Sequence, residues 1–138
     1  MKKISFIVFT SILILTLNSC ATKAGFSTSK VVPEARGYVK VEVDDNKDYV
    51  IRIHLSDLVE SSRLRPSKRT YVVWMVTDQY TTKNIGQVFS SASDFPYKLK
   101  STFVAVSPFK PAKIFITAEN DASIKYPGVQ VVLSTNRF

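Results

Sequence analysis

The sequence is poor in the residues on which several classes of protein depend. It has one cysteine, Cys20, one histidine, His54, and four glycines in 138 residues. A single cysteine excludes an internal disulfide framework, and four glycines are too few for a glycine-rich phosphate-binding loop. The Gly-x-Ser-x-Gly pattern of many hydrolases does not occur either. We therefore expect no catalytic residues, no metal site and no cofactor, and no enzyme activity.

Long apolar runs are lacking as well. The main apolar stretch extends from Ile4 to Leu17 and follows Lys2 and Lys3. As a helix it would be about 21 Å long at about 1.5 Å per residue, whereas a bilayer core is about 30 Å thick. A basic head before a short apolar run is typical of a secretory signal. The alternative, a buried N-terminal helix, is disfavoured because the stretch has no polar face to show to water.

The end of this apolar stretch resembles the lipobox of bacterial lipoproteins. That pattern has Leu three residues before an obligatory Cys and a small residue just before it, and this chain reads Leu17-Asn18-Ser19-Cys20. The resemblance implies a signal peptide over 1–19 and a lipid, including palmitate-type acyl chains, on Cys20. Each buried CH₂ of such a lipid contributes about 0.8 kcal/mol, and two or more chains anchor a protein stably. A free thiol beside an ordinary signal cleavage site is the alternative.

The resemblance also implies a place in the cell. Ala21 follows Cys20, and in many Gram-negative bacteria Asp at this place would favour inner-membrane retention. The expected location is therefore the cell envelope, lipid-anchored and facing the periplasm, at the outer membrane. The net charge of +8 would also suit nucleic acid, but an exported lipid-anchored protein rarely meets it. We expect the membrane as a partner and no nucleic acid.

Residues 20–36 have little apolar periodicity and are rich in Ser, Thr, Lys, Gly and Pro. This composition predicts a lipidated Cys20 followed by a flexible tether, in which Val31 and Val32 could begin an edge strand. The folded domain is then expected over 37–138.

From residue 37 onward, strand patterns dominate the sequence. Apolar residues alternate with polar ones, for example Val39, Val41 and Val43 in one segment and Ile51, Ile53 and Leu55 in the next. Turn-forming residues separate these segments. The expected strands cover 38–43, 49–55, 70–77, 85–90, 97–107, 113–119 and 129–135. About seven strands with frequent turns predict an all-β, antiparallel, immunoglobulin-like β-sandwich, with Trp74 on the third strand as a core tryptophan.

The C-terminal half resembles the extracytoplasmic domain of the anti-sigma-K-factor family. That pattern has Tyr-x-x-Trp, a Gly before a short strand, a Phe-x-x-Thr-x-Glu-like strand, a loop with Pro and Gly, and a final apolar strand. The residues in the matching places are Tyr71, Trp74, Gly86, Phe115, Thr117, Glu119, Pro127, Gly128 and Val131 to Ser134. The resemblance implies a β-sandwich on the envelope side of a membrane. Those anti-sigma factors also have a cytoplasmic helical domain and a membrane-spanning helix, which this chain lacks, so no sigma-factor binding is implied.

A basic run is the best candidate for recognition. Arg63, Arg65, Lys68 and Arg69 place four positive charges around Pro66. They could contact anionic lipid headgroups, where each basic residue near the surface contributes about 1 kcal/mol, or lipopolysaccharide phosphates or an acidic protein. An ordinary solvated loop is the alternative.

Other polar groups are weaker candidates. Asp44, Asn46 and Asp48 have the first three positions of a calcium loop, but Tyr49 and Leu55 occupy the places that need Gly and Glu. We interpret this stretch as a hairpin turn. Asp57 and Glu60 could mimic a pair of catalytic carboxylates, but no apolar setting marks either one. His54 is interpreted as an ordinary strand residue.

Two functional hypotheses remain. The first is a non-enzymatic, lipid-anchored binding or structural module of the cell envelope that contacts an envelope protein or an anionic glycolipid. The second is an accessory to envelope stress signalling that contacts a separate membrane regulator. An uncovered face of the strand over 70–77 would provide a further partner site; burial of both faces at the centre of the sandwich is the alternative.

Overall fold

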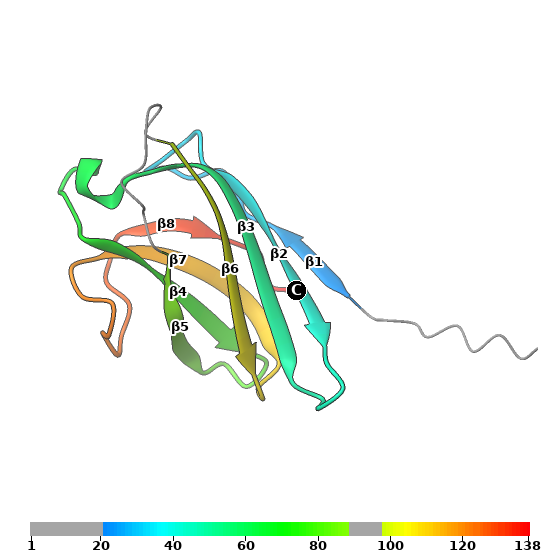
Figure 1. Ribbon diagram of the computed structural model, residues 1–138. Helices are drawn as coiled ribbons and strands as arrows, with labels where there is room; N and C mark the ends of the chain where they lie inside the picture. The colour runs from blue at the N-terminus through cyan, green and yellow to red at the C-terminus, as the bar shows by residue number, and fades with distance from the viewer. Residues whose placement is uncertain (1–20, 89–97) are drawn as a thin grey trace, which may run out of the picture.

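The protein is a sandwich of two antiparallel sheets, and the computed structural model describes residues 21–88 and 98–138 (Figure 1). The first sheet has the order β1-β2-β3-β6 and the second has the order β5-β4-β7-β8. The strands of the first sheet are β1 (Thr22–Gly25), β2 (Arg36–Val43), β3 (Tyr49–Val59) and β6 (Lys98–Ser107). Those of the second are β4 (Thr70–Thr77), β5 (Thr82–Val88), β7 (Pro111–Glu119) and β8 (Val131–Ser134). The prediction of an all-β antiparallel sandwich is confirmed.

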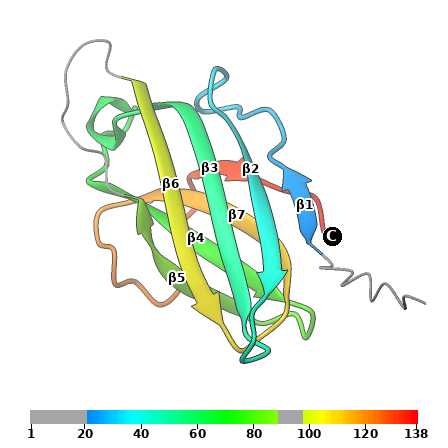
Figure 2. The same ribbon diagram turned by 45° about the vertical axis from the view of Figure 1, so that its right-hand side comes forward.

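The strand order explains how the chain closes the sandwich. β3 pairs with β6 in one sheet and β4 pairs with β7 in the other, so the chain crosses between the sheets after β3, β5 and β6 (Figure 2). Without β1, the orders β2-β3-β6 and β5-β4-β7-β8 correspond to strands A-B-E and C′-C-F-G of an immunoglobulin-like sandwich. The eighth strand, β1, was not expected from the sequence.

Strand β3 is longer than its apolar alternation predicts. Ile51, Ile53 and Leu55 point into the core, and the alternation then breaks, so the sequence predicts an end at Leu55. The pairing with β6 shifts between Leu55 and Leu58, where Asp57 has a φ of 57°. A β-bulge places one extra residue on one strand. It returns Leu58 to the core side, where Leu58 is fully buried.

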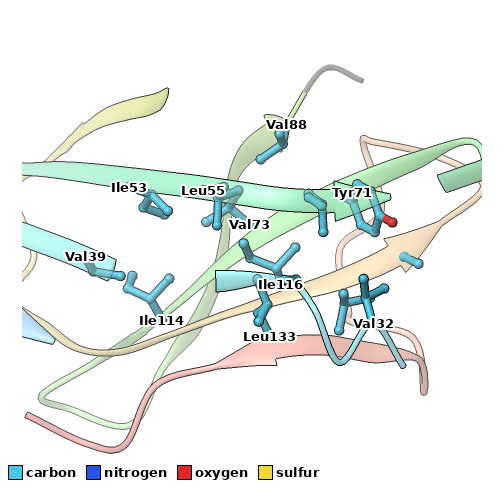
Figure 3. Close-up of a cluster of buried hydrophobic side chains, with 14 of the residues drawn as sticks. Val32, Val39, Ile53, Leu55, Tyr71, Val73, Val88, Ile114, Ile116 and Leu133 are labelled. Atoms are coloured by element: carbon cyan, nitrogen blue, oxygen red, sulfur yellow. The ribbon is translucent and has the colours of Figure 1, made fainter. Parts of the chain in front are cut away.

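The main core lies between the two sheets (Figure 3). Side chains of β2 and β3, such as Val39 and Ile53, face those of β4 and β7, such as Val73 and Ile116, and all four are fully buried. Tyr71 is also in this core, and its hydroxyl donates a hydrogen bond of 2.6 Å to the backbone oxygen of Val59. Burial raises the pKa of this hydroxyl. Tyr71 therefore connects the start of β4 to the end of β3.

The expectation of a flexible tether over 20–36 is wrong for the described part, residues 21–36. β1 pairs with β2 from Thr22, opposite Val41, to Gly25, opposite Tyr38. The backbone N–H of Ser27 then donates to the oxygen of Ser134 on the other sheet at 2.9 Å. Val32 and Ala35 are buried in the main core, and no edge strand forms at Val31 and Val32. The folded domain therefore begins near residue 22 and not at residue 37.

Trp74 is fully buried, but not between the sheets. On β4, Tyr71, Val73 and Met75 belong to the main core, whereas Trp74 points to the opposite face of the second sheet. The β7–β8 connection, residues 120–130, crosses this outer face. Its backbone binds β5 through Asn84, whose amide donates to the oxygens of Ala122 and Ile124. Both faces of β4 are thus covered, as the apolar sequence of this strand predicts. The inner face packs in the main core, and the outer face is covered by the β7–β8 connection.

Candidate functional site

The basic run forms a fixed loop between β3 and β4. After β3 the chain makes the short helical turn η1 (Ser61–Arg63). The backbone oxygen of the buried Ser61 accepts hydrogen bonds from the N–H groups of Leu64 and Lys68, at 3.2 and 3.0 Å. The N–H of Arg69 bonds to the backbone oxygen of Glu119 at 3.0 Å, and the side chain of Leu64 is buried in the main core. The loop is therefore held at its middle and at its end, and its charged side chains project from a fixed backbone.

The structure divides the four basic residues into two pairs. Lys68 and Arg69 line a shallow hollow of about 440 Å³ together with Glu60, Asn120 and three serines of the loop. Arg63 and Arg65 line a second hollow, of about 520 Å³, beside Leu64. The two hollows thus share this loop. The sequence placed all four charges in one cluster because spacing alone does not show which way each side chain turns.

The charges of this loop are only partly neutralised. Arg63 lies 3.8 Å from Glu60. Within the described part of the chain, no carboxylate lies within ion-pair distance of Arg65, Lys68 or Arg69. Arg65 and Arg69 are exposed and Lys68 is half-buried. Three cationic groups are therefore available to an anionic partner.

Residues distant in sequence complete the second hollow. Lys30 and Gln130 line it with Arg63 and Arg65, and Lys30 brings a further positive charge. The Oε1 atom of Gln130 is buried without a hydrogen-bond partner among the described residues, which is unusual because buried polar atoms are normally paired. Sequence reasoning missed both residues, since Lys30 lies in the expected tether and Gln130 in an expected strand.

The basic loop and Thr22 lie at opposite ends of the sandwich. Thr22 is paired with Val41, near the turn between β2 and β3. The basic loop follows the other end of β3 (Figure 1). β3 has 11 residues and spans about 33 Å at about 3.3 Å per residue. We call these two regions the basic end, formed around residues 60–69, and the Thr22 end, formed by Thr22 and the turns over 44–48, 78–81 and 108–110.

A hydrogen-bond chain fixes the loop that covers Trp74. The indole N–H of Trp74 donates to the hydroxyl oxygen of Thr117 at 2.8 Å, and this hydroxyl donates to Oε1 of Glu119 at 2.6 Å. The same carboxylate oxygen accepts the N–H of Gly128 at 2.7 Å. A Cβ at Gly128 would lie 2.7 Å from Oε2 of Glu119, so a larger residue would displace the carboxylate. All four residues belong to the pattern on which the anti-sigma-K-factor resemblance depends.

Gly86, another residue of that pattern, has a structural role. Its φ of 137° lies in a region that other residues rarely adopt. It lies at the register shift between β4 and β5, and its N–H donates to the side-chain oxygen of Asn84 at 3.0 Å. A Cβ here would lie 2.9 Å from the ring of Phe103 on β6. Gly86 thus allows the two sheets to approach each other at this corner.

The residues with calcium-loop spacing form a hairpin turn, as we interpreted them. Oδ1 of Asp44 accepts the backbone N–H groups of Asn46 and Asp48, both at 2.9 Å. Lys47 has a φ of 62°, as a tight turn requires. Across the described part of the chain, no group of three or more His, Cys, Asp or Glu side chains is placed to hold a metal ion.

His54 lies on the outer face of the first sheet. Its ring stacks on that of Tyr38 with 4.8 Å between centroids, and the ammonium of Lys23 lies 4.2 Å from the centroid of the Tyr38 ring. Beside this stack, Lys40 and Glu42 form a 2.9 Å ion pair. The hydrogen bond and charge of Lys40 lower the pKa of Glu42.

The structure places Asp57 and Glu60 in different surroundings. Asp57 occupies the bulge of β3, and the carboxylate of Glu60 lies beside the guanidinium of Arg63.

Cys20 lies outside the described residues, so its lipidation stays a prediction. No helix within residues 21–88 and 98–138 is long and apolar enough to cross a membrane. No family model, no curated protein and no solved structure is significantly similar to this chain. The resemblances to lipoproteins and to the anti-sigma-K-factor family likewise stay predictions.

Proposed function

We propose that this protein is a non-enzymatic, lipid-anchored module of the bacterial cell envelope, held at the outer membrane through Cys20. Its basic end binds an anionic group on an envelope protein or an anionic glycolipid. The observation that supports this most is the set of cationic groups of Arg65, Lys68 and Arg69, which project from a fixed loop. No carboxylate of the described chain neutralises them.

The distance between the two ends favours a partner away from the anchoring membrane. If Cys20 bears the lipid, only Ala21 separates it from β1, which begins at Thr22. The basic loop would then lie about 30 Å from the anchored end, given the rise of about 3.3 Å per residue along β3. This is well beyond the Debye length of about 8 Å at physiological salt. The loop is therefore better placed for a partner in the periplasm than for headgroups of its own leaflet.

The anchor is tested by metabolic labelling with a clickable fatty acid. We expect the full chain to take up the label and Cys20→Ser to take up none, because the thioether-linked lipid needs the sulfur. Ser27→Ala is a control on an exposed residue close to Cys20 and should keep the label. Label retained by Cys20→Ser, or absent from the native chain, would remove the anchor from the proposal.

The basic end is tested by charge reversal. We expect a triple variant, Arg65→Glu, Lys68→Glu and Arg69→Glu, to abolish salt-sensitive binding of the anchor-free domain to vesicles that contain lipopolysaccharide. A domain that starts at residue 21 is suitable because every residue of the main core lies after that point. The matched control reverses Lys47, Lys110 and Lys125, which changes the net charge equally at exposed sites outside the basic end. Equal loss in both variants would mean that net charge, and not this loop, determines binding.

If neither variant changes vesicle binding, the basic end does not bind this lipid surface, and a protein partner is tested next. In-cell crosslinking of the lipidated chain then separates the two protein hypotheses. Capture of an envelope assembly protein that is lost in the triple variant supports the binding module, whereas capture of a membrane regulator supports the signalling accessory. No specific partner in either assay contradicts a recognition function for the basic end.

A further inference from the structure

The Thr22 end of the sandwich combines the entry point of the chain with exposed apolar side chains. Val43 and Phe109 are 55% and 49% exposed, and Tyr80 is 78% exposed. They lie in or beside the three turns of this end, over 44–48, 78–81 and 108–110. Figure 2 shows these three turns at the same end of the sandwich. The backbone N–H of Asp78 bonds to the oxygen of Lys110, so two of these turns are joined. Large apolar side chains gathered on one end of a soluble domain mark an interaction surface.

A hollow between the sheets extends this surface. Its volume is about 290 Å³, and Thr22 itself lines it with Val43, Tyr49 and Phe138. The C-terminal residue Phe138 is fixed here because its N–H donates to the backbone oxygen of Ala112 at 2.8 Å. The apolar surface therefore continues from the turns to the strand on which the chain enters the domain.

Cationic side chains cover part of the aromatic rings at this end. The ammonium of Lys83 lies 4.5 Å from the ring centroid of Phe109, and the guanidinium of Arg137 lies 4.1 Å from that of Tyr80. Aromatic rings beside Lys and Arg are typical of the water–lipid boundary, where long cationic side chains extend toward the headgroups. Acidic groups are present too, so the charges at and next to this end have both signs. They are Asp44, Asp45, Asp48, Asp78, Lys23, Lys47, Lys83, Lys110, Lys113 and Arg137.

The short link to Cys20 places this end at the bilayer surface. Two residues of chain reach at most about 7 Å at about 3.3–3.6 Å per residue, so Thr22 must lie within about 7 Å of Cys20. A lipid on Cys20 holds that residue in the headgroup region, which is about 5–7 Å thick on each side of the hydrocarbon core. The neighbouring strand β2, paired with β1 at Val41, is brought to the same level.

We infer that the Thr22 end rests on the anchoring bilayer, with Val43, Tyr80 and Phe109 in the interfacial region and the basic end facing away from the membrane. This inference rests on the proposed function, because it needs the lipid on Cys20. The contact is apolar in character, since Val43, Tyr80 and Phe109 form it and the charges around them have both signs. The occupant is therefore a bilayer surface of any headgroup charge, and the lipid on Cys20 together with this contact sets one orientation of the domain.

The single cysteine provides a direct test. A chain that begins at Cys20 retains every strand, and its thiol is coupled to a maleimide lipid in phosphatidylcholine vesicles. Phe109→Trp serves as a reporter at the Thr22 end and Val129→Trp as a reporter in the exposed β7–β8 connection. Trp74 is fully buried, so its emission is a constant background. We expect brominated lipids to quench most of the emission added by Phe109→Trp and none of that added by Val129→Trp.

Two further measurements test whether the Thr22 end contacts the bilayer or is only held near it by the link to Cys20. Adding Val43→Glu and Phe109→Glu to a Tyr80→Trp reporter should abolish its quenching, whereas high salt should leave the quenching of Phe109→Trp unchanged. Equal quenching of the reporters at Phe109 and Val129 would overturn the inference. Quenching that disappears in high salt would also overturn it, because an apolar contact is not screened.

This result is independent of the test of the proposed function. The anchor in cells is read by mass spectrometry of the tryptic peptide from Cys20 to Lys23. An unmodified peptide would remove the proposed lipid anchor even if the coupled domain docks on vesicles. An acylated peptide with unquenched Phe109→Trp would keep the anchor and remove the docking surface.

Discussion

Trp74→Ala should destabilise the domain by about 3–5 kcal/mol, the range found for removal of a large buried aromatic side chain. Trp74 is fully buried and stacks on Phe115 with 6.2 Å between centroids. Its removal would leave a cavity between the second sheet and the β7–β8 connection. It would also leave the hydroxyl of Thr117 without the indole donor that it binds at 2.8 Å.

The loss is measured by urea unfolding followed by far-UV circular dichroism, because the variant lacks the only tryptophan. Tyr126→Ala is the matched control: it removes an aromatic ring from the β7–β8 connection, but one that is 77% exposed. Its effect should stay within about 0.5 kcal/mol, as for most surface substitutions. A loss below about 1 kcal/mol for Trp74→Ala would mean that the connection does not seal this face in solution.

Glu119→Ala should have the next largest effect, a loss of about 1–3 kcal/mol. The carboxylate is buried and accepts hydrogen bonds from the Thr117 hydroxyl and the Gly128 N–H. Removing it leaves the buried hydroxyl of Thr117 without its acceptor, which costs about 1–3 kcal/mol. It also frees the N–H of Gly128, but Gly128 is exposed and its N–H can bond to water. Part of this cost is offset, because the change also removes a buried carboxyl group that has no cationic partner among residues 21–88 and 98–138.

Glu119→Gln is the matched control, since it keeps an acceptor oxygen at nearly the same volume. We expect it to retain most of the stability in the same urea titration. If Gln is as harmful as Ala, the negative charge and not the hydrogen-bond geometry holds the connection. A double-mutant cycle adds a check, because Gly128→Ala should be less harmful in a Glu119→Ala background, where no carboxylate opposes the new methyl group.

The hydrogen-bond chain changes the meaning of the family resemblance. Trp74, Thr117, Glu119 and Gly128 belong to the pattern that carries this resemblance. In the structure they fix a long connection over the outer face of the second sheet. A match at these positions therefore indicates a similar fold and says nothing of a shared partner.

The two ends of the sandwich give the proposed function a direction. At the Thr22 end, exposed apolar side chains lie beside the point where the chain enters the domain, and charges of both signs surround them. At the basic end, Arg65, Lys68 and Arg69 have no carboxylate partner among the described residues. A rigid core connects them, so a lipid at one end would present the basic loop at a set height and orientation. Lengthening the link between Cys20 and Thr22 should therefore impair partner capture without changing partner affinity in solution.

Local patterns were enough to predict most of the fold. An apolar run predicted the strand over 70–77 with its observed bounds, and alternating apolar residues predicted most of β2 and the first part of β3. The basic run was visible as four charges close together in sequence, and its place in a long connection between two strands was expected correctly. These features depend on neighbours within a few residues, which is the distance over which side-chain periodicity and turn chemistry act.

Other features depended on contacts between distant segments. Residues 21–36 lack periodicity, yet β2 offers an edge that β1 can pair with, and Val32 and Ala35 find places in the core. Trp74 is buried on the outer face because a connection more than 40 residues later in the chain covers it. Sequence alone thus determined the strand content, the charge and the expected anchor. Only the tertiary structure decided that the β7–β8 connection covers the outer face of β4 and that the basic loop and Thr22 lie at opposite ends. Both features follow from contacts between segments that are distant in sequence.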